Sequence, residues 1–203
     1  MLEAPKETLI EQIHESTNLI EELLRKSLFD IVPAYNSIAV FGSFTTDDLI
    51  LQLEGKHGIE TQTESSDQII KLPICYEVGL DLEKVAKHAK MSVEEVIDIH
   101  LKGIYRSLFI GFTPGFVYAD GLDERLACPR LEKPRTHIPE GSIGIAGNQT
   151  GLYSLSSPGG WNIIGRTPVA VFDPKRKPIM LIEVGSRYIF HRITKQQFDS
   201  WGS

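Results

Sequence analysis

The motif PRLEKPR carries the two residues best suited to hold an anion, Arg130 and Arg135. Each arginine directly follows a proline, whose ring fixes its own φ and restricts the local backbone. A guanidinium held in this way can donate two parallel hydrogen bonds to a carboxylate or a phosphate. The chain has 27 acidic residues against 21 Lys and Arg, so salt bridges to Asp or Glu are an equal alternative for both arginines.

Aromatic and polar residues follow one another through a glycine-rich stretch that runs from residue 111 to residue 168. Glycine is concentrated where a backbone needs positive φ or a close approach, so tight turns should bring these side chains together. One outcome is a pocket with apolar walls and a few polar groups, and the other is turn chemistry with ordinary core packing. The predicted substrate-binding residues are Phe112, Pro114, Phe116, Gln149, Thr150, Ser157, Gly159, Gly160 and Trp161.

Two further residues join Arg130 and Arg135 as catalytic candidates, His100 and Tyr153. His100 lies on the apolar face of a predicted helix, where a histidine is either a catalyst or a satisfied core residue. Cys128 has no basic neighbour in the sequence to activate it as a nucleophile. The two cysteines of the chain form no CxxC motif or Cys/His cluster, so no metal site is predicted.

The first part of the chain, residues 1–72, predicts a small α/β sandwich. Apolar residues recur with helical spacing from residue 5 to about residue 28. A strand is predicted over residues 35–44, a short helix over 45–53 and a second strand over 68–76. The order α-β-α-β is typical of a small two-layer domain.

The second part, residues 73–203, predicts two helices followed by short strands. Ser92 and Glu95 have the spacing of a capping box, and Gly103 ends that helix. Short strands separated by Gly and Pro favour a small barrel or sandwich, so the chain as a whole is assigned to the α+β class. The predicted strands cover residues 116–118, 142–146, 161–164 and 169–172, with a hairpin of 179–184 and 188–193 and a short helix over 195–201.

Composition and charge disfavour several classes of protein. The net charge of −6 and the acidic face of the second helix disfavour nucleic acid, although the helix pair resembles a helix-turn-helix. No run reaches the roughly 20 apolar residues of a membrane helix, and no signal peptide is recognised, so a cytoplasmic protein is expected. The segment GSIGIAG at residues 141–147 is not a phosphate loop, because neither GK[ST] nor a helix follows it. It indicates a strand whose small residues pack closely against a neighbour.

An ordered set of motifs over about residues 32–192 closely resembles the family of the 5-oxoprolinase B subunit. That family has also been labelled allophanate hydrolase subunit 1, and it contains a sporulation histidine-kinase inhibitor. The motifs are PICYE at residues 73–77, DLEKVAKHAKMSVEEVIDIH at 81–100, GFTPGF at 111–116, PRLEKPR at 129–135, IPEGSIGIAGNQTGLY at 138–153 and SPGGWNIIGRTP at 157–168.

The resemblance implies a cyclophilin-like β-barrel of the carboxyltransferase type after the N-terminal domain. It implies a protein that works with a homologous C subunit and a separate A subunit, in a complex that opens 5-oxoproline to L-glutamate with ATP and its Mg²⁺. A shared site would leave an apolar surface around Phe112, Phe116 and Trp161, so the isolated chain is expected to form a homo-oligomer with little or no activity. A module that inhibits a sensor histidine kinase and a component of an allophanate hydrolase are the alternatives.

Two features depart from the family pattern. Members usually begin with a strand before the first helix, whereas this chain starts almost at the helix, so its N-terminal sheet is expected to lack an edge strand. Members commonly carry proline where this chain has Ser154, which predicts a looser turn at that point. Neither departure falls in GFTPGF, PRLEKPR or SPGGW.

Overall fold

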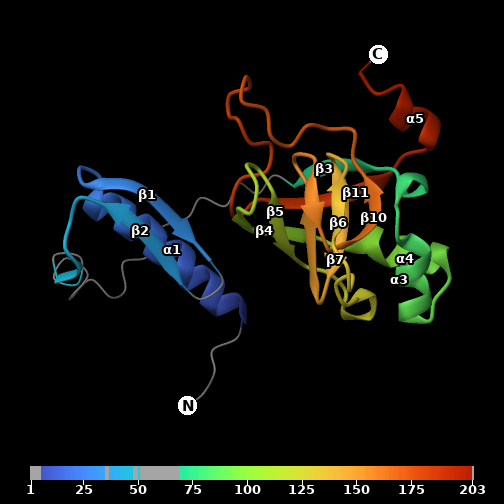
Figure 1. Ribbon diagram of the computed structural model, residues 1–203, viewed down its shortest axis with the longest axis horizontal. Helices are drawn as coiled ribbons and strands as arrows, with labels where there is room; N and C mark the ends of the chain where they lie inside the picture. Colours follow the sequence, from blue (N-terminus) through green and yellow to red (C-terminus); the bar gives the residue numbers. More distant parts are fainter. Residues whose placement is uncertain (1–5, 35–36, 48–49, 51–68, 203) are drawn as a thin grey trace. The chain divides into compact units, whose positions relative to one another are not determined.

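The structure is a computed structural model that describes residues 6–34, 37–47, 50 and 69–202 (Figure 1). It divides into two compact units, residues 1–64 and residues 65–203. The division precedes residue 72, at which the sequence placed the end of the first domain. All residues predicted for the candidate site belong to the second unit.

The first unit contains a helix and a two-stranded antiparallel sheet. Helix α1 (Lys6–Leu24) buries Ile13 and Ile20, which belong to the apolar stripe that predicted it. Strand β1 (Leu28–Pro33) pairs with strand β2 (Ile38–Gly42). The helix packs against β1, so the sheet covers the apolar stripe of the helix.

The boundaries within the first unit differ from the prediction at one place. The chain leaves the helix at Ser27, whose N–H donates to the Leu24 carbonyl at 2.7 Å, and Leu28 already begins β1. The sequence LFDIVP is rich in residues that favour strands, which overrides the helical spacing of Leu28. Strand β2 confirms the strand predicted over residues 35–44, whereas most of the helix predicted over 45–53 lies outside the described residues.

The second unit is built on a nearly closed seven-stranded sheet. The strand order is β10-β7-β8-β5-β4-β11-β3, and the end strands β10 and β3 meet through a bridge between Arg166 and Cys75. The two residues exchange backbone hydrogen bonds of 2.8 and 3.0 Å, so the sheet is closed at that point into a barrel. The strands are β3 (Ile70–Ile74), β4 (Tyr105–Ile110), β5 (Val117–Asp120), β7 (Ser142–Ala146), β8 (Gln149–Leu152), β10 (Asn162–Arg166) and β11 (Arg187–Arg192).

Strand β3 corrects the prediction that the α-β-α-β sandwich ends near residue 72. It runs parallel to β11, with Ile70 opposite Tyr188 and Ile74 opposite Arg192, and is therefore part of the barrel. An apolar strand sequence requires a sheet to bury it but does not say which one. The sequence identified the strand correctly and gave it the wrong partner.

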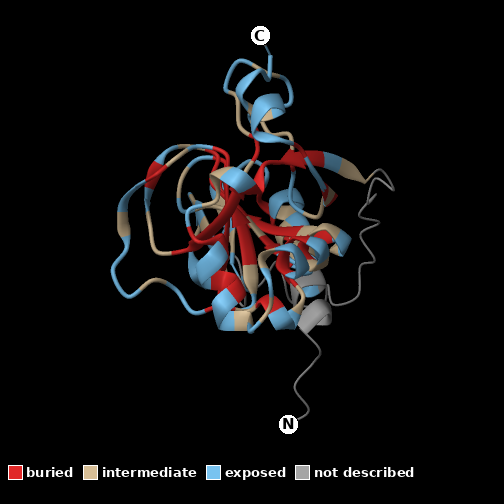
Figure 2. Ribbon diagram, turned by 90° about the vertical axis from the view of Figure 1, so that its right-hand side faces the viewer, coloured by how far each residue is buried: buried red, intermediate tan, exposed pale blue. Residues whose placement is uncertain are grey.

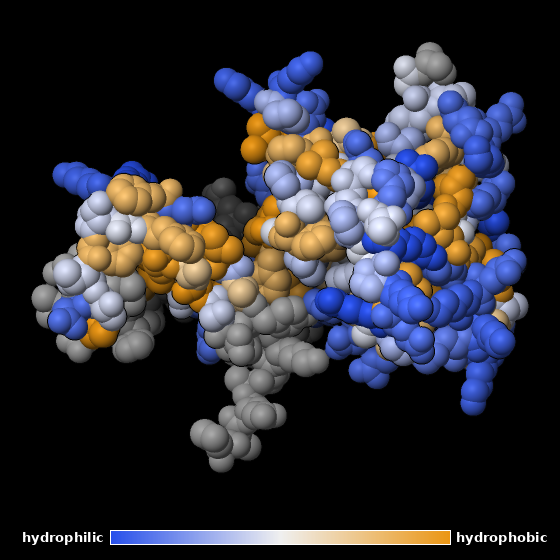
Figure 3. All heavy atoms as spheres, in the orientation of Figure 1, coloured by the Kyte–Doolittle hydropathy of each residue, from blue (hydrophilic) through white to orange (hydrophobic). Residues whose placement is uncertain are grey.

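Two helices, preceded by the 3₁₀ turn η1 (Tyr76–Val78), follow β3 as predicted. Helix α3 (Leu82–Ala89) packs against β10, and α4 (Val93–Lys102) packs against β11. Ser92 and Glu95 form the predicted capping box at the start of α4. Figure 3 shows that hydrophilic residues dominate the surface where α3 and α4 lie.

The segment between β10 and β11 does not form the predicted strands. Residues 169–172 and 179–184 share only a single bridge, Phe172 with Met180. The Gly185–Ser186 turn bonds instead to Ser107 of β4, at 2.9 and 3.0 Å. We call residues 167–186 the arm. Its conformation is held by Arg176, whose guanidinium donates to the carbonyls of Ala170, Val171, Pro178 and Ile179 at 2.9–3.3 Å.

The chain closes with a short helix, α5 (Lys195–Asp199), as predicted. Thr194 caps it: its hydroxyl accepts from the Gln197 N–H, and the Gln197 side chain accepts from the Thr194 N–H. None of the helices in the described ranges has the length and apolarity needed to cross a bilayer.

The barrel sheet is covered on both faces, and Figure 2 shows its strands coloured as buried. Alternate residues such as Val117, Ile143 and Ile145 form the core inside the barrel. A second core lies on the outer face, where a ribbon of β6 (Arg135–Ile138) and β9 (Ser157–Gly159) covers the sheet. Every residue of β7 is buried, because the strand is enclosed from both sides.

Candidate functional site

Five aromatic rings gather on the outer face of the barrel and form the centre of the candidate site. Phe116 lies 4.6 Å from Tyr118, 4.9 Å from Tyr153 and 5.6 Å from Trp161, measured between ring centroids. Phe112 adds an edge-on contact to Phe116 at 5.6 Å. The motifs GFTPGF and SPGGW therefore meet in space. We call these five residues the aromatic cluster.

Glycines in neighbouring strands make room for Trp161. Gly151 of β8 lies opposite Gly144 of β7 and opposite Tyr118 of β5. A Cβ on Gly151 would come within 2.7 Å of the Trp161 ring and 2.8 Å of the Phe116 ring, and a Cβ on Gly144 would lie 3.0 Å from the Trp161 Cβ. The predicted strand of small residues, packed closely against a neighbour, is thereby confirmed for GSIGIAG.

Arg130 lies over the aromatic cluster and is exposed. Its guanidinium carbon is 5.8 Å from the centroid of the Trp161 ring, a cation–π arrangement. Burial raises the pKa of Tyr118, and the positive charge of Arg130 works against that rise. Arg130 thus forms the cationic edge of the cluster.

Arg135 has a different role. Its guanidinium donates two hydrogen bonds, of 2.6 and 2.8 Å, to the buried carboxylate of Asp81. Asp81 precedes α3 and also accepts the backbone N–H of Ile163 at 2.8 Å. The sequence left two alternatives for each arginine, a salt bridge to an acidic side chain or a free guanidinium that can bind an anion. Arg135 forms the salt bridge, whereas no carboxylate among the described residues pairs with Arg130.

Tyr153 lies beneath Arg130 and Arg135, with only 1% of its surface exposed. Burial raises the pKa of its phenol to about 12, although the Trp161 backbone N–H and the two arginines lower it in part. The hydroxyl is therefore neutral near pH 7. It can serve as a hydrogen-bond partner but is not available as a base.

His100 lies apart from the other candidates, on the side of α4 that packs against β11. It is fully buried; its Nδ1 pairs with the Tyr76 hydroxyl at 2.7 Å, and its ring stacks on Phe190 at 4.9 Å. Burial lowers the pKa of the imidazole to about 3. These surroundings are those of a core histidine, but Nε2 has no hydrogen-bond partner among the described residues, so the ring is only partly satisfied.

The other predicted residues mostly support the backbone of the site. The Thr150 hydroxyl donates to the Gly144 carbonyl at 3.2 Å, and a side chain on Gly159 would collide with the Tyr153 hydroxyl. Gly160 accepts the Leu131 N–H at 2.7 Å. Ser157 is buried and Gln149 half-buried, and the Ser157 hydroxyl has no hydrogen-bond partner among the described residues.

Ser154 does not loosen its turn, contrary to the expectation from the family pattern. Its buried hydroxyl donates to the carbonyl of Pro114 at 2.5 Å. This bond ties the GFTPGF loop to the chain that follows β8.

The expected apolar surface around three aromatic residues is largely absent, because the chain covers it itself. Phe116 and Trp161 are 1% and 5% exposed, respectively. Only Phe112 projects, with 63% of its surface exposed and a positive φ of 71°. Such a backbone conformation is strained for an aromatic residue. The GFTPGF loop therefore holds the Phe112 side chain outward at a cost in conformational free energy.

Two residues that the sequence reasoning missed belong to the site, Tyr118 and Asp81. Tyr118 follows Phe116 by two residues in an extended segment, and this spacing places both rings on one face of the sheet. That signal was available in the sequence. Asp81 offered none, because its partner Arg135 lies 54 residues further along the chain.

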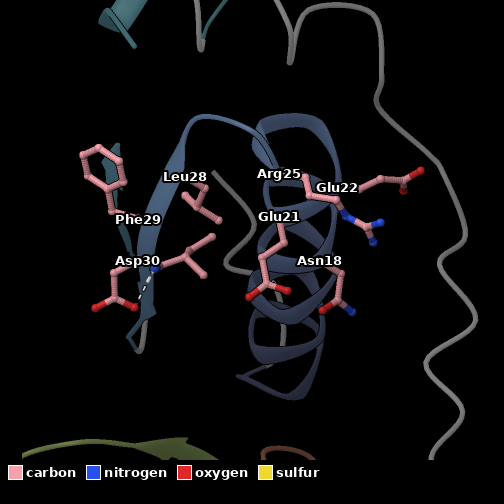
Figure 4. Close-up of a pocket in the computed structure, with 8 residues that line it drawn as sticks. Asn18, Glu21, Glu22, Arg25, Leu28, Phe29 and Asp30 are labelled. Atoms are coloured by element: carbon pink, nitrogen blue, oxygen red, sulfur yellow. Dashed lines mark hydrogen bonds between the residues drawn. The ribbon is translucent and has the colours of Figure 1, made fainter. Parts of the chain in front are cut away.

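A separate hollow of about 630 Å³ lies in the first unit, between α1 and β1 (Figure 4). Its walls combine acidic, basic and apolar side chains, and none of the candidate residues belongs to it. The lining residues are Asn18, Glu21, Glu22, Arg25, Leu28, Phe29, Asp30 and Ile31. Within the part of the chain that the structure describes, no three His, Cys, Asp or Glu side chains are placed to hold a metal ion.

Known sequences similar to this chain share one family. The family described as carboxyltransferase domain, subdomain C and D, matches residues 1–182. The 5-oxoprolinase B subunit of Bacillus subtilis is 38% identical, and the match covers 93% of this chain and 85% of that protein. The protein of the same name from Haemophilus influenzae is also 38% identical, over 81% of this chain and 79% of its own length.

Solved structures similar to this chain include two proteins at more than 30% identity. A conserved uncharacterized protein from Pyrococcus horikoshii has a TM-score of 0.64 and 37% identity, covering 97% of this chain and 93% of that one. The protein TTHA0988 has a TM-score of 0.79 and 33% identity over 95% of this chain, which spans only 38% of that longer protein.

A more distant likeness extends to the Kluyveromyces lactis urea carboxylase. Its TM-score is 0.71 at 17% identity, covering 98% of this chain and 21% of that one, so it supports the fold alone. The barrel fold and the sequence matches agree. The chain belongs to the family of the 5-oxoprolinase B subunit, within the carboxyltransferase domains of subdomain C and D.

Proposed function

We propose that this chain is the B subunit of an ATP-dependent 5-oxoprolinase complex. The complex consumes 5-oxoproline, ATP and two molecules of water and releases L-glutamate, ADP and phosphate. The observation that carries the proposal is the 38% identity to the B. subtilis 5-oxoprolinase B subunit over 93% of this chain. The site through which the chain contributes is the aromatic cluster with Arg130.

The chain acts with two partners, a homologous cyclophilin-like C subunit and an A subunit. The segment GSIGIAG at residues 141–147 does not form a phosphate loop, because β7 passes through a tight turn at Gly147 directly into β8 instead of a helix. ATP and its Mg²⁺ are therefore assigned to the complex, and no step through them is assigned to residues of this chain. The exposed Phe112 on its strained loop is the residue we assign to contact with a partner.

The isolated chain is proposed to be a cytoplasmic protein that self-associates and has little or no activity of its own. Because Phe116 and Trp161 are buried, the driving force for self-association is limited to exposed residues such as Phe112. Light scattering on the purified chain tests this part. A strictly monomeric chain that opens 5-oxoproline unaided would overturn it.

The reaction is tested by combining the chain with purified A and C subunits and measuring glutamate released from 5-oxoproline with and without ATP. Glutamate formation that requires ATP is the expected result. A parallel mixture receives allophanate, whose conversion to ammonia is the activity suggested by the allophanate label. Ammonia release without glutamate formation would replace the proposed function with that alternative.

A further inference from the structure

Arg130 differs from five other arginines of the barrel unit in what its guanidinium contacts. Arg125, Arg135 and Arg192 donate to carboxylates, and Arg166 and Arg176 donate to backbone carbonyls. Arg130 has neither kind of acceptor among the described residues and lies on the Trp161 ring instead. Stacking uses the face of a guanidinium and leaves the N–H groups on its edge free to donate.

The backbone around Arg130 is fixed on both sides. The carbonyl of Pro129 accepts the Asn162 side-chain amide at 2.8 Å. The N–H of Leu131 donates to the Gly160 carbonyl at 2.7 Å. An exposed cation without an anionic partner is therefore held by neighbours on both sides, which lowers the entropy lost when it binds a ligand.

The surroundings of Arg130 suit a small ring with one negative charge. The half-buried Tyr118 lies 5.9 Å from Trp161, and both Tyr118 and Tyr153 sense the charge of Arg130. The indole of Trp161 thus lies under the guanidinium, and the phenol of Tyr118 packs beside that indole. A carboxylate matches the guanidinium fork, and a ring amide matches a phenol that can donate or accept a hydrogen bond.

We propose that Arg130, Trp161 and Tyr118 form a subsite in which Arg130, held over the Trp161 ring, binds the carboxylate of a carboxylate-bearing lactam while the lactam ring contacts the half-buried Tyr118. This inference rests on the proposed function, because 5-oxoproline is such a molecule. A phosphate group would offer the same acceptor oxygens, so a nucleotide phosphate is the competing source of the anion. Arg130 is in this view the residue that selects a charged lactam over a neutral one.

Trp161 provides a direct test of binding that does not depend on catalysis. Trp201, the second tryptophan, lies exposed in the C-terminal segment, so a Trp201→Phe variant makes Trp161 the sole indole reporter. The full chain is titrated with 5-oxoproline, with 2-pyrrolidinone, which has the same ring without the carboxylate, and with inorganic phosphate. We expect a saturable fluorescence change with 5-oxoproline and no such change with 2-pyrrolidinone or inorganic phosphate.

Arg130→Gln, in the same Trp201→Phe background, should raise the Kd for 5-oxoproline about 10- to 100-fold, as expected for the loss of a charge-assisted hydrogen bond. Arg130→Lys keeps the charge without the fork and should fall between Gln and wild type. Lys133→Gln removes an exposed charge from the same segment and is the matched control, with no change expected. Equal responses to both lactams, a response to phosphate alone, or no response would overturn the inference.

Kinetics of the complete complex separate this inference from the proposed function. Arg130→Gln should raise KM for 5-oxoproline about 10- to 100-fold and change kcat much less, because the carboxylate takes no part in the bond that breaks and keeps its charge throughout ring opening. An active complex with an unchanged KM would overturn the role of Arg130 and leave the proposed function intact. A wild-type complex that forms no glutamate would overturn the proposed function, while the fluorescence titration would still decide whether the subsite exists.

Discussion

At the scale of single residues, His100 links the stability of the barrel to pH. The unfolded imidazole titrates near pH 6.5, whereas burial lowers the pKa in the folded protein to about 3. Between these values the unfolded chain binds a proton that the folded chain excludes. The free energy of unfolding should therefore fall as pH drops from about 6.5 towards 3, with a slope from this group approaching about 1.4 kcal/mol per pH unit.

The change His100→Asn tests this link. Asparagine keeps a polar atom near the Tyr76 hydroxyl and removes the titrating group. Urea unfolding is measured at a series of pH values. The free energy of unfolding of the variant should depend less steeply on pH than that of the wild-type chain, and the difference in slope should correspond to at most one bound proton. His88→Asn, at an exposed histidine of α3, is the matched control and should keep the wild-type slope. Parallel curves for His100→Asn and wild type would contradict the assignment.

Gly151 is the second prediction at this scale. An added methyl group would collide with the rings of Trp161 and Phe116, both of which are enclosed by neighbours. Gly151→Ala should lower the free energy of unfolding by about 1–3 kcal/mol, as overpacking does, and should change the near-ultraviolet circular dichroism. Gly111→Ala, at a glycine with nothing within 4 Å of the new methyl group, should leave both unchanged. Equal effects of the two substitutions would show that the aromatic cluster is not closely packed on β8.

At the scale of elements, Asp81 joins the start of α3 to β6 and β10. Its carboxylate receives Arg135 and the Ile163 N–H at the same time. Asp81→Asn can still accept from Ile163 but leaves Arg135 half-buried without its counter-ion. We expect a loss of about 1–3 kcal/mol in the free energy of unfolding, below the full cost of a buried charge because water still reaches Arg135.

The exposed pair of Arg125 and Asp123 is the matched control for the Asp81 variant. Arg125→Ala should not change the denaturant midpoint measurably, since solvent screens an exposed pair. Chemical denaturation of both variants decides between the two environments. A shift for Arg125→Ala as large as that for Asp81→Asn would contradict the role given to Asp81.

The arm depends on Arg176 in a way that hydrogen exchange can measure. Its guanidinium satisfies four carbonyls of a segment that has little regular structure. Arg176→Ala should speed amide exchange in residues 167–186 while β7 and β8 exchange as before. Lys175→Ala, at the neighbouring exposed side chain, should leave exchange in the arm unchanged. Faster exchange across the whole barrel would show that the arm is not an independent unit of stability.

Element types could be predicted from the sequence where the signal is local, and strand partners could not. The capping box of α4 and the small residues of β7 lie within a few positions of each other, so the sequence reveals them directly. The strand Ile70–Ile74 was recognised, but its partner β11 is at the other end of the chain. Residues 179–184 have a strand composition, yet the neighbouring turn bonds to β4 and leaves them unpaired with β11.

At the scale of the whole molecule, the candidate site also combines features that local sequence predicts with features that only the fold determines. The motifs GFTPGF and SPGGW indicated that Phe112, Phe116 and Trp161 could lie together, and PRLEKPR singled out Arg130 and Arg135 as anion-binding candidates. They could not distinguish Arg130 from Arg135, because both follow a proline and only the fold brings Asp81 to one of them. They also could not show that the barrel covers Phe116 and Trp161, since burial depends on the β6–β9 ribbon.

The dependence of 5-oxoproline turnover on this chain tests the central claim most directly. The A and C subunits are held at fixed concentration with ATP and 5-oxoproline, and glutamate release is measured as this chain is added in increasing amounts. The rate should start near zero, rise with added chain and saturate at a fixed stoichiometry, while the chain alone forms no glutamate. A rate that is already maximal before any of this chain is added would contradict its assignment as an essential part of the complex.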